Sequence, residues 1–224
     1  MEGTVFLFAL PALVFAALGD LYLRLGSVKP EEDGEALPLR TLFSERQRRI
    51  SALCAAVFGT ALAVYSVLRF HDTAEYTLKL LFILAWLVPI ALIDGRCHVI
   101  QNRMVLAGFA AFLLFTLAEW LVLRVSLPVL LKNAGLGLAM GFGVFALCAL
   151  LSKGGMGAGD VKLFSVLGLL LGWDGVFLLI FLTTLFIAVT GILLILLKQK
   201  EKSSRLPAGP FVLLAMAAAM LLGV

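Results

Sequence analysis

Four acidic residues lie within or at the edge of long apolar blocks, and they are Asp20, Asp94, Glu119 and Asp160. An ionised carboxylate at the centre of a bilayer costs at least ~2.5 kcal/mol, so acids in such blocks often have a function. Glu119 precedes Trp120 near the end of its block, which favours an interfacial anchor. Asp20 lies five residues before the end of the first block, where a structural role is the simpler interpretation. Asp94 and Asp160 remain as candidates for chemistry.

Asp94 closes an apolar stretch, and Asp160 ends a glycine run immediately before another apolar stretch. Two carboxyl groups that meet at one membrane face could hydrolyse a peptide bond by an aspartyl mechanism. One ionised carboxylate takes a proton from water, while the other, kept protonated, polarises the scissile carbonyl. The two acids therefore meet the chemical requirement of an aspartyl hydrolase.

Glycines precede the second acid at positions 157 and 159. Hydrolysis needs an extended substrate backbone close to the enzyme, and we expect Gly157 and Gly159 to remove side chains there and to permit positive φ. A glycine-rich turn alone is more typical of packing or of a hinge. Lys162 could interact with the charged pair or could extend to the lipid headgroups. His98 is interpreted as a loop histidine, since an aspartyl pair needs no imidazole.

The composition places these acids in a membrane protein. Of the 224 residues, 62% are hydrophobic and 14% are charged, against about half and about a quarter in soluble domains. The apolar residues fall in blocks of about 20, the length of a helix that crosses a bilayer. We expect an all-α polytopic helix bundle with seven to eight transmembrane segments. The expected spans are 5–25, 50–68, 79–94, 104–123, 132–151, 161–172, 176–197 and 207–224, the sixth apolar block being split at 172–175.

Basic residues predict the orientation. Fourteen of the 18 Lys and Arg residues fall in or beside four regions, 26–49, 94–103, 152–162 and 198–205. Because Lys and Arg are enriched on the cytoplasmic side, these regions are predicted to be cytoplasmic and the N-terminus external. Both catalytic candidates then lie at the cytoplasmic face of the inner (plasma) membrane.

The whole chain, 1–224, is expected to form a single membrane-embedded peptidase domain, with 26–49 as a short solvated cytoplasmic loop. The block from Val5 to Leu25 has neither a basic region before it nor a cleavage site after it, so we expect a retained first helix. Cys54, Cys97 and Cys148 form no CxxC pair, which argues against a zinc site or a disulfide framework. We expect no metal, no other cofactor and no nucleic-acid partner.

Three motifs resemble the type IV prepilin peptidases, GxGD membrane aspartic proteases that remove the short basic leader of pilin-like precursors. Residues 153–163 read K-G-G-M-G-A-G-D-V-K-L and match the family signature K-x-G-M-G-x-G-D-x-K-L at every fixed position. Asp94 is followed after five residues by Ile100-Gln101-Asn102, where the family has Ile-Pro-Asn. Residues 207–211, P-A-G-P-F, resemble the family's P-F-G-P-F. The resemblance covers about 80–224 and implies that Asp94 and Asp160 are catalytic, with Gly157, Gly159, Lys162 and Asn102 as motif residues.

Two departures from the family pattern matter. Gln101 replaces a proline after the first aspartate. Loop 26–49 contains no cysteine, whereas long members carry paired CxxC motifs there, in a region that N-methylates the new pilin N-terminus. The chain therefore resembles a short form without the methyltransferase loop, and methylation is not expected. The implied partners are a prepilin-like substrate, with a basic leader and a hydrophobic helix, and the lipid bilayer. Association with further copies of the chain stays open.

Two other function classes also fit part of the pattern. Intramembrane acids and helices broken by glycine describe proton-coupled transporters as well, but the two halves of the chain show no inverted repeat. Presenilin-like and signal-peptide-peptidase-like proteases pair their GxGD with Tyr-Asp and Pro-Ala-Leu motifs. Here the first aspartate follows Ile93, and Pro-Ala-Leu occurs only at Pro11.

Overall fold

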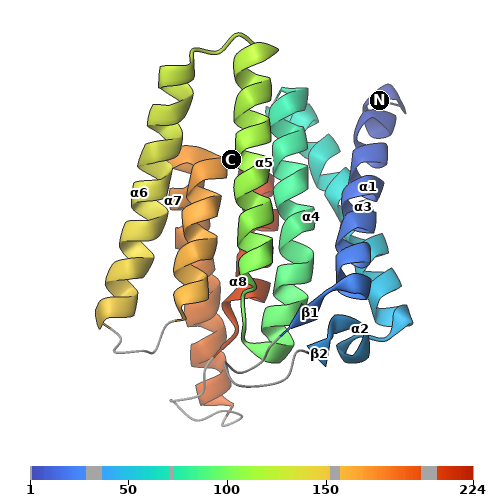
Figure 1. The fold of residues 1–224 in the computed structure, drawn as a ribbon, viewed down its shortest axis with the longest axis vertical. Helices are drawn as coiled ribbons and strands as arrows, with labels where there is room; N and C mark the ends of the chain where they lie inside the picture. Colours follow the sequence, from blue (N-terminus) through green and yellow to red (C-terminus); the bar gives the residue numbers. More distant parts are fainter. Residues whose placement is uncertain (1, 29–36, 71–72, 152–156, 198–205, 224) are drawn as a thin grey trace.

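The computed structural model describes residues 2–28, 37–70, 73–151, 157–197 and 206–223. They form a bundle of long helices with a small two-stranded hairpin at one end (Figure 1). The elements in chain order are α1 (Glu2–Leu25), β1 (Ser27–Val28), β2 (Leu37–Pro38), α2 (Leu39–Leu42), α3 (Glu45–Phe70), α4 (Ala74–Cys97), α5 (Asn102–Leu121), α6 (Leu127–Leu151), α7 (Ala158–Leu196) and α8 (Ala208–Leu222).

The prediction of an all-α polytopic bundle is confirmed. Among the described residues, six helices are long and apolar enough to cross a membrane, and α8 is a shorter apolar helix of 15 residues. Several helices begin about one turn earlier than expected, in α3 and α4 because a polar first turn precedes the apolar block. Thus α3 begins at Glu45, α4 at Ala74 and α6 at Leu127. The chain is an integral membrane protein.

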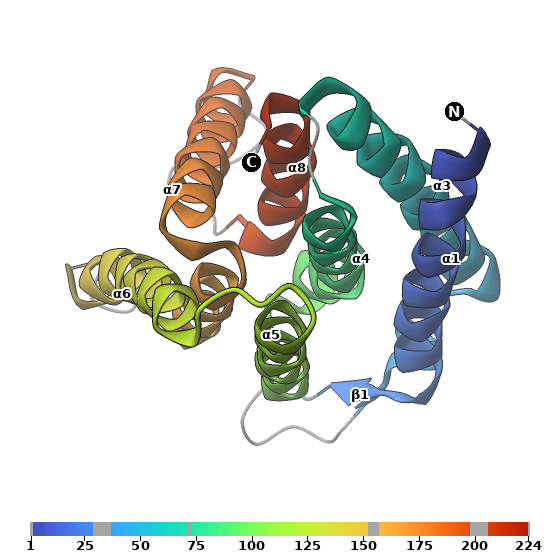
Figure 2. The same cartoon turned by 90° about the horizontal axis from the view of Figure 1, so that it is seen from above.

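Helix α7 is broken at Gly172, where φ is 71° and ψ is −168°. The predicted interruption is confirmed, although no loop separates the halves. Both Asp160 and Gly191 lie near Leu206, whereas a straight helix would place them about 46 Å apart. The second half therefore turns back toward the end where the first half began (Figures 1 and 2). The amide of Trp173, freed by the break, donates to Oδ1 of Asn133 at 3.2 Å.

The first half of α7 packs closely against α6. A Cβ atom at Gly137 would overlap backbone atoms of Gly168, and one at Gly141 would overlap the backbone of Phe164. Small residues let transmembrane helices approach in this way. Phe145 stacks on Phe164 with ring centroids 3.8 Å apart. This contact fixes the helix whose first turn carries the second candidate aspartate.

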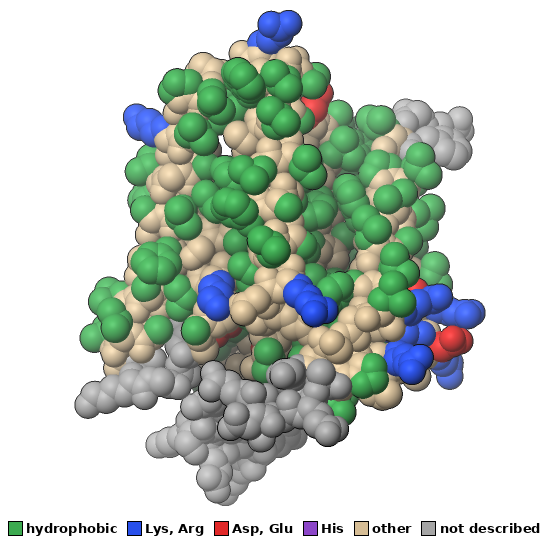
Figure 3. All heavy atoms as spheres, in the orientation of Figure 1, with side chains coloured by type: hydrophobic (Ala, Val, Ile, Leu, Met, Phe, Trp, Pro, Cys, Tyr) green, Lys and Arg blue, Asp and Glu red, His purple; other side chains and the backbone are tan. Residues whose placement is uncertain are grey.

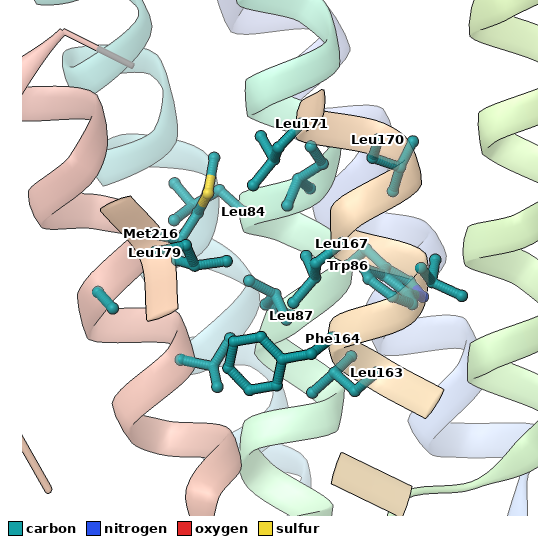
Figure 4. Packing of buried hydrophobic residues seen from close by; sticks show 14 of the residues in the cluster. Leu84, Trp86, Leu87, Leu163, Phe164, Leu167, Leu170, Leu171, Leu179 and Met216 are labelled. Carbon is teal, nitrogen blue, oxygen red and sulfur yellow. The ribbon is translucent and has the colours of Figure 1, made fainter. Parts of the chain in front are cut away.

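Helix α4 lies at the centre of the bundle, and most of its length is buried. In Figure 4, Leu84 of α4 lies beside Met216 of α8 and Leu179 from the second half of α7, and Leu87 of α4 lies beside Leu167 from the first half of α7. Both halves of α7 and helix α8, all distant in the sequence, thus hold α4, whose C-terminal part carries the first candidate aspartate.

The C-terminal ends of α1, α4 and α6 and the N-terminal ends of α3, α5, α7 and α8 lie at one end of the bundle, the lower end in Figure 1. Most of the Lys and Arg side chains visible in Figure 3 also lie toward this end, while hydrophobic side chains cover the helices above. The described part of region 26–49 is more structured than a solvated loop. It forms β1, β2 and α2, and Val28, Leu39 and Phe43 are buried with Leu23 and Ile93.

Candidate active site

Asp94 lies near the end of α4, and its residue is only 4% exposed. The helix continues for three residues to Cys97 and is closed by His98, which has a left-handed backbone with φ 52°. The amide of His98 donates to the Asp94 carbonyl at 2.9 Å. The turn that follows Asp94 is therefore fixed by its own backbone.

The first turn of α8 touches the Asp94 carboxylate. The amide of Gly209 donates to Oδ2 of Asp94 at 2.7 Å. A Cβ atom at Gly209 would lie 3.0 Å from Cβ of Asp94 and 3.1 Å from Cα of Ala91. Only glycine allows α8 to approach α4 closely enough for this hydrogen bond without displacing one of them.

Asp160 is the third residue of α7, after the N-cap Gly157. Its amide donates to the Gly157 carbonyl at 3.1 Å. Acidic side chains are favoured in the first turn of a helix, where backbone N–H groups are unpaired. The helix start thus presents this carboxyl group at the same end of the bundle as Asp94.

Both aspartates line one cavity of about 300 Å³. Its wall consists of the end of α4 and the segment after it, the start of α7, and the start of α8 with the residues before it. The lining residues are Asp94, His98, Val99, Ile100, Gly157, Ala158, Gly159, Asp160, Leu206, Pro207 and Ala208. The structure therefore brings together Asp94, Asp160, Gly157 and Gly159 of the residues identified from the sequence. A cavity with two carboxyl groups and mixed polar and apolar walls can hold water beside an extended peptide.

The glycines act differently from the sequence-based expectation of positive φ. Among the described glycines, φ is positive only at Gly172 and Gly223. Gly157 has an extended backbone with φ −74°. A Cβ atom at Gly159 would lie 2.9 Å from Cβ of Ile100. The expectation of positive φ at 157 and 159 was wrong, because Gly159 is needed for close packing rather than for an unusual backbone.

Lys162 and Asn102 contact each other and do not line the cavity. Nζ of Lys162 donates to Oδ1 of Asn102 at 2.9 Å, in an exposed position. Within the described part of the chain, no ion pair joins Lys162 to either aspartate. This hydrogen bond joins the start of α5, the helix that follows Asp94, to the start of α7, the helix that contains Asp160.

The other two intramembrane acids lie elsewhere, with basic partners. Asp20 contacts Arg24 at 2.8 Å and Arg48 at 3.9 Å, where α1 meets α3. Glu119 pairs with Lys79 at 2.6 Å, and both side chains are largely buried. Neither acid lines the cavity.

Two features of the site were not assigned from the sequence. His98 was interpreted as a loop residue, yet it lines the cavity. The contact of Gly209 with Asp94 was also missed, although the motif at 207–211 was the signal that could have revealed it. In the part of the chain that the structure describes, no group of three or more His, Cys, Asp or Glu residues is arranged to hold a metal ion. Cys54, Cys97 and Cys148 are unpaired thiols.

Several known proteins are similar to this chain in sequence. The prepilin leader peptidase/N-methyltransferase of Aeromonas salmonicida (strain A449) is 34% identical over 147 residues, which are 63% of this chain and 48% of that protein. The proteins of the same name from Pseudomonas aeruginosa and Bacillus subtilis (strain 168) are each 32% identical, over 64% of this chain and 49% and 54% of their own lengths. The matched part thus spans about half the length of these relatives. No solved structure matches significantly.

The profile of the type IV leader peptidase family matches residues 81–192, which is half of the chain. This range contains both aspartates that line the cavity. Given this match, the chain belongs to the type IV leader peptidase family.

Proposed function

We propose that this protein is a membrane aspartic endopeptidase that removes the leader peptide of type IV prepilin-like precursors, with Asp94 and Asp160 as its catalytic acids. The observation that carries the proposal is the single cavity that both aspartates line at one end of the bundle. Family membership supports the same reaction.

The reaction needs the two carboxyl groups in different protonation states. One, ionised, accepts a proton from the attacking water, and the other donates a proton to the carbonyl oxygen of the scissile bond. The amide of Gly209 orients the Asp94 carboxylate by its hydrogen bond to Oδ2. The space beside Gly157 is free for the substrate main chain. A Cβ atom at Gly157 would lie 3.7 Å from its nearest neighbour, Oδ2 of Asp160.

The position of the cavity fits a substrate that is itself anchored in the membrane. The hydrophobic helix of the precursor would lie among the apolar helices, and its basic leader would extend past the end of the bundle. We infer that this end is cytoplasmic, because described basic residues such as Arg48, Arg96 and Lys162 belong to helix ends that lie there, and Lys and Arg are enriched on the cytoplasmic side. The N-terminus then lies on the external side.

We also propose that the protein cleaves without N-methylating its product. The matched relatives bear names that include an N-methyltransferase. Region 26–49 of this chain has no cysteine, and its described residues pack on α1 and α4. The described part of this region therefore packs on the bundle and does not form a separate surface for a second substrate.

The proposal is tested with purified protein in liposomes and a substrate that joins a basic leader, ending in Gly, to a hydrophobic segment. We expect a single cut at the leader boundary. Asp94→Asn and Asp160→Asn should each lower the rate by at least ~10³-fold, as loss of a catalytic group does, with membrane insertion unchanged. Asp20→Asn and Glu119→Gln serve as matched controls and should retain most of the activity. Substantial cleavage by either dyad variant would remove that residue from the mechanism.

A further inference from the structure

The segment between α4 and α5, residues 98–101, forms part of the cavity wall. Three of its residues, His98, Val99 and Ile100, line the cavity. His98 closes α4 behind Asp94, and Ile100 packs against the backbone of Gly159 in the first turn of α7. The position of this connector thus affects the surroundings of both aspartates.

Gln101 ends the connector and is the N-cap of α5, with φ −76° and ψ 133°. An N-cap side chain usually accepts a hydrogen bond from the first turn of its own helix. The side chain of Gln101 makes no such bond. Its amide group reaches back to residues more than 70 positions earlier in the sequence.

Both ends of the Gln101 amide have partners in the N-terminal segment. Oε1 accepts a hydrogen bond from the hydroxyl of Tyr22, in the last turn of α1. Nε2 donates to the carbonyl of Ser27, in β1, at 3.1 Å. All three residues are partly buried. One side chain therefore joins the connector to α1 and to the hairpin, neither of which lines the cavity.

The two hydrogen bonds of Gln101, here called the bridge, lie beside a buried cluster of hydrophobic residues. The neighbouring Leu23 and Val28 are buried against Ile93, the residue before Asp94. The partners of Gln101 are thus themselves packed on the end of α4. A hydrogen-bonded amide between two fixed elements restricts the backbone that carries it, and catalytic geometry is sensitive to displacements of about 1 Å.

We propose that Gln101 is a positioning residue for the dyad: its amide, held by Tyr22 and Ser27, fixes the connector 98–101 against the two aspartates. The inference rests on the proposed peptidase function. It adds residues of α1 and β1 to those that position the aspartates. Both elements lie outside the part of the chain that the family profile matches.

The first test compares Gln101→Met, which keeps the length but removes both hydrogen bonds, with Tyr22→Phe, which removes one. We expect Gln101→Met to lower kcat about tenfold or more with little change in KM, because the connector is displaced while the substrate surface remains. Tyr22→Phe should lower kcat by less. The double variant should equal Gln101→Met, since Tyr22 acts through Gln101. A wild-type kcat for Gln101→Met, or independent effects that multiply in the double variant, would overturn the proposal.

Glu119→Gln is the matched control, because it changes another partly buried side-chain contact, at the opposite end of the bundle. It should lower the unfolding temperature without a change in kcat beyond about twofold. If Gln101→Met behaved in the same way, its role would be structural only.

A second measurement does not depend on peptidase activity. In a background where the three cysteines are replaced by alanine, Val99→Cys is labelled with a water-soluble maleimide. The labelling rate should rise several-fold when Gln101→Met or Tyr22→Phe is added, and it should not change with Glu119→Gln. Equal rates in all variants would overturn the proposal. If the wild type cleaved no leader substrate, the proposed function would fail, while the labelling rates would still decide whether the bridge holds the connector.

Discussion

The amide nitrogen of Gly209 lies 2.7 Å from Oδ2 of Asp94, although 115 residues separate them in the sequence. This hydrogen bond makes the start of α8 part of the site that the other helices form. The contact also requires glycine at position 209. A Cβ atom there would lie only 3.0 Å from Cβ of Asp94 and 3.1 Å from Cα of Ala91. The first prediction follows from this contact.

Gly209→Ala should separate α8 from α4 and weaken the hydrogen bond to Asp94. Overpacking of this kind costs about 1–3 kcal/mol, and we expect leader cleavage to fall by about tenfold or more. Cleavage rate and thermal unfolding in detergent measure the two effects. Gly95→Ala is the control, because its Cβ atom would lie 3.7 Å from the Pro210 ring, an ordinary contact. Equal activity in both variants would show that the close approach at Gly209 is unimportant.

The two motif glycines should respond differently to alanine. At Gly159 the new Cβ atom would lie 2.9 Å from Cβ of Ile100, so the connector must move and kcat should fall about tenfold. At Gly157 the nearest atom would be 3.7 Å away and φ suits any residue. Gly157→Ala should therefore unfold within about 2 °C of the wild type, with its effect confined to KM. A larger loss of stability in Gly157→Ala than in Gly159→Ala would contradict this assignment.

The membrane orientation is tested by reporter fusions. A reporter after Arg40 should be cytoplasmic, and one near Thr73 should be external, because the basic regions favour the cytoplasmic side. A fusion after Lys200, a position outside the described residues, should also be cytoplasmic. A cytoplasmic reporter near Thr73 would place the dyad cavity on the outer face, where a leader could not reach it.

Cleavage should be independent of chelators and should leave the product unmethylated. Two carboxyl groups can activate water without a Lewis acid, so prolonged treatment with EDTA should not change the rate. Mass spectrometry of the product, made with this protein alone and added S-adenosylmethionine, should show a free N-terminal amine. A product heavier by one methyl group would contradict the proposal that this protein does not N-methylate the cleaved product.

Local features of the sequence were enough to predict the helices and the candidate residues. The apolar blocks determine which segments cross the membrane, because backbone groups in lipid must be paired within a helix. Residues 172–175 were identified as an interruption of the longest apolar block, and the helix is broken at the first of them, Gly172. The predicted topology placed Asp94 and Asp160 at the same membrane face, and the motifs around them resemble those of one peptidase family. These features depend on neighbours along the chain, so they can be read from it.

The contacts that complete the site depend on how the helices pack. Nothing local predicts that Gly209 donates to Asp94, that Gln101 reaches Tyr22, or that Lys162 pairs with Asn102 rather than with an aspartate. Gly159 shows the difference most clearly. Its sequence context suggested an unusual backbone, whereas its place against Ile100 makes it a packing residue. The sequence determined which residues could do the chemistry. Only the tertiary structure decided their partners, because these contacts join helices far apart in the chain and form only when side-chain size lets those helices approach.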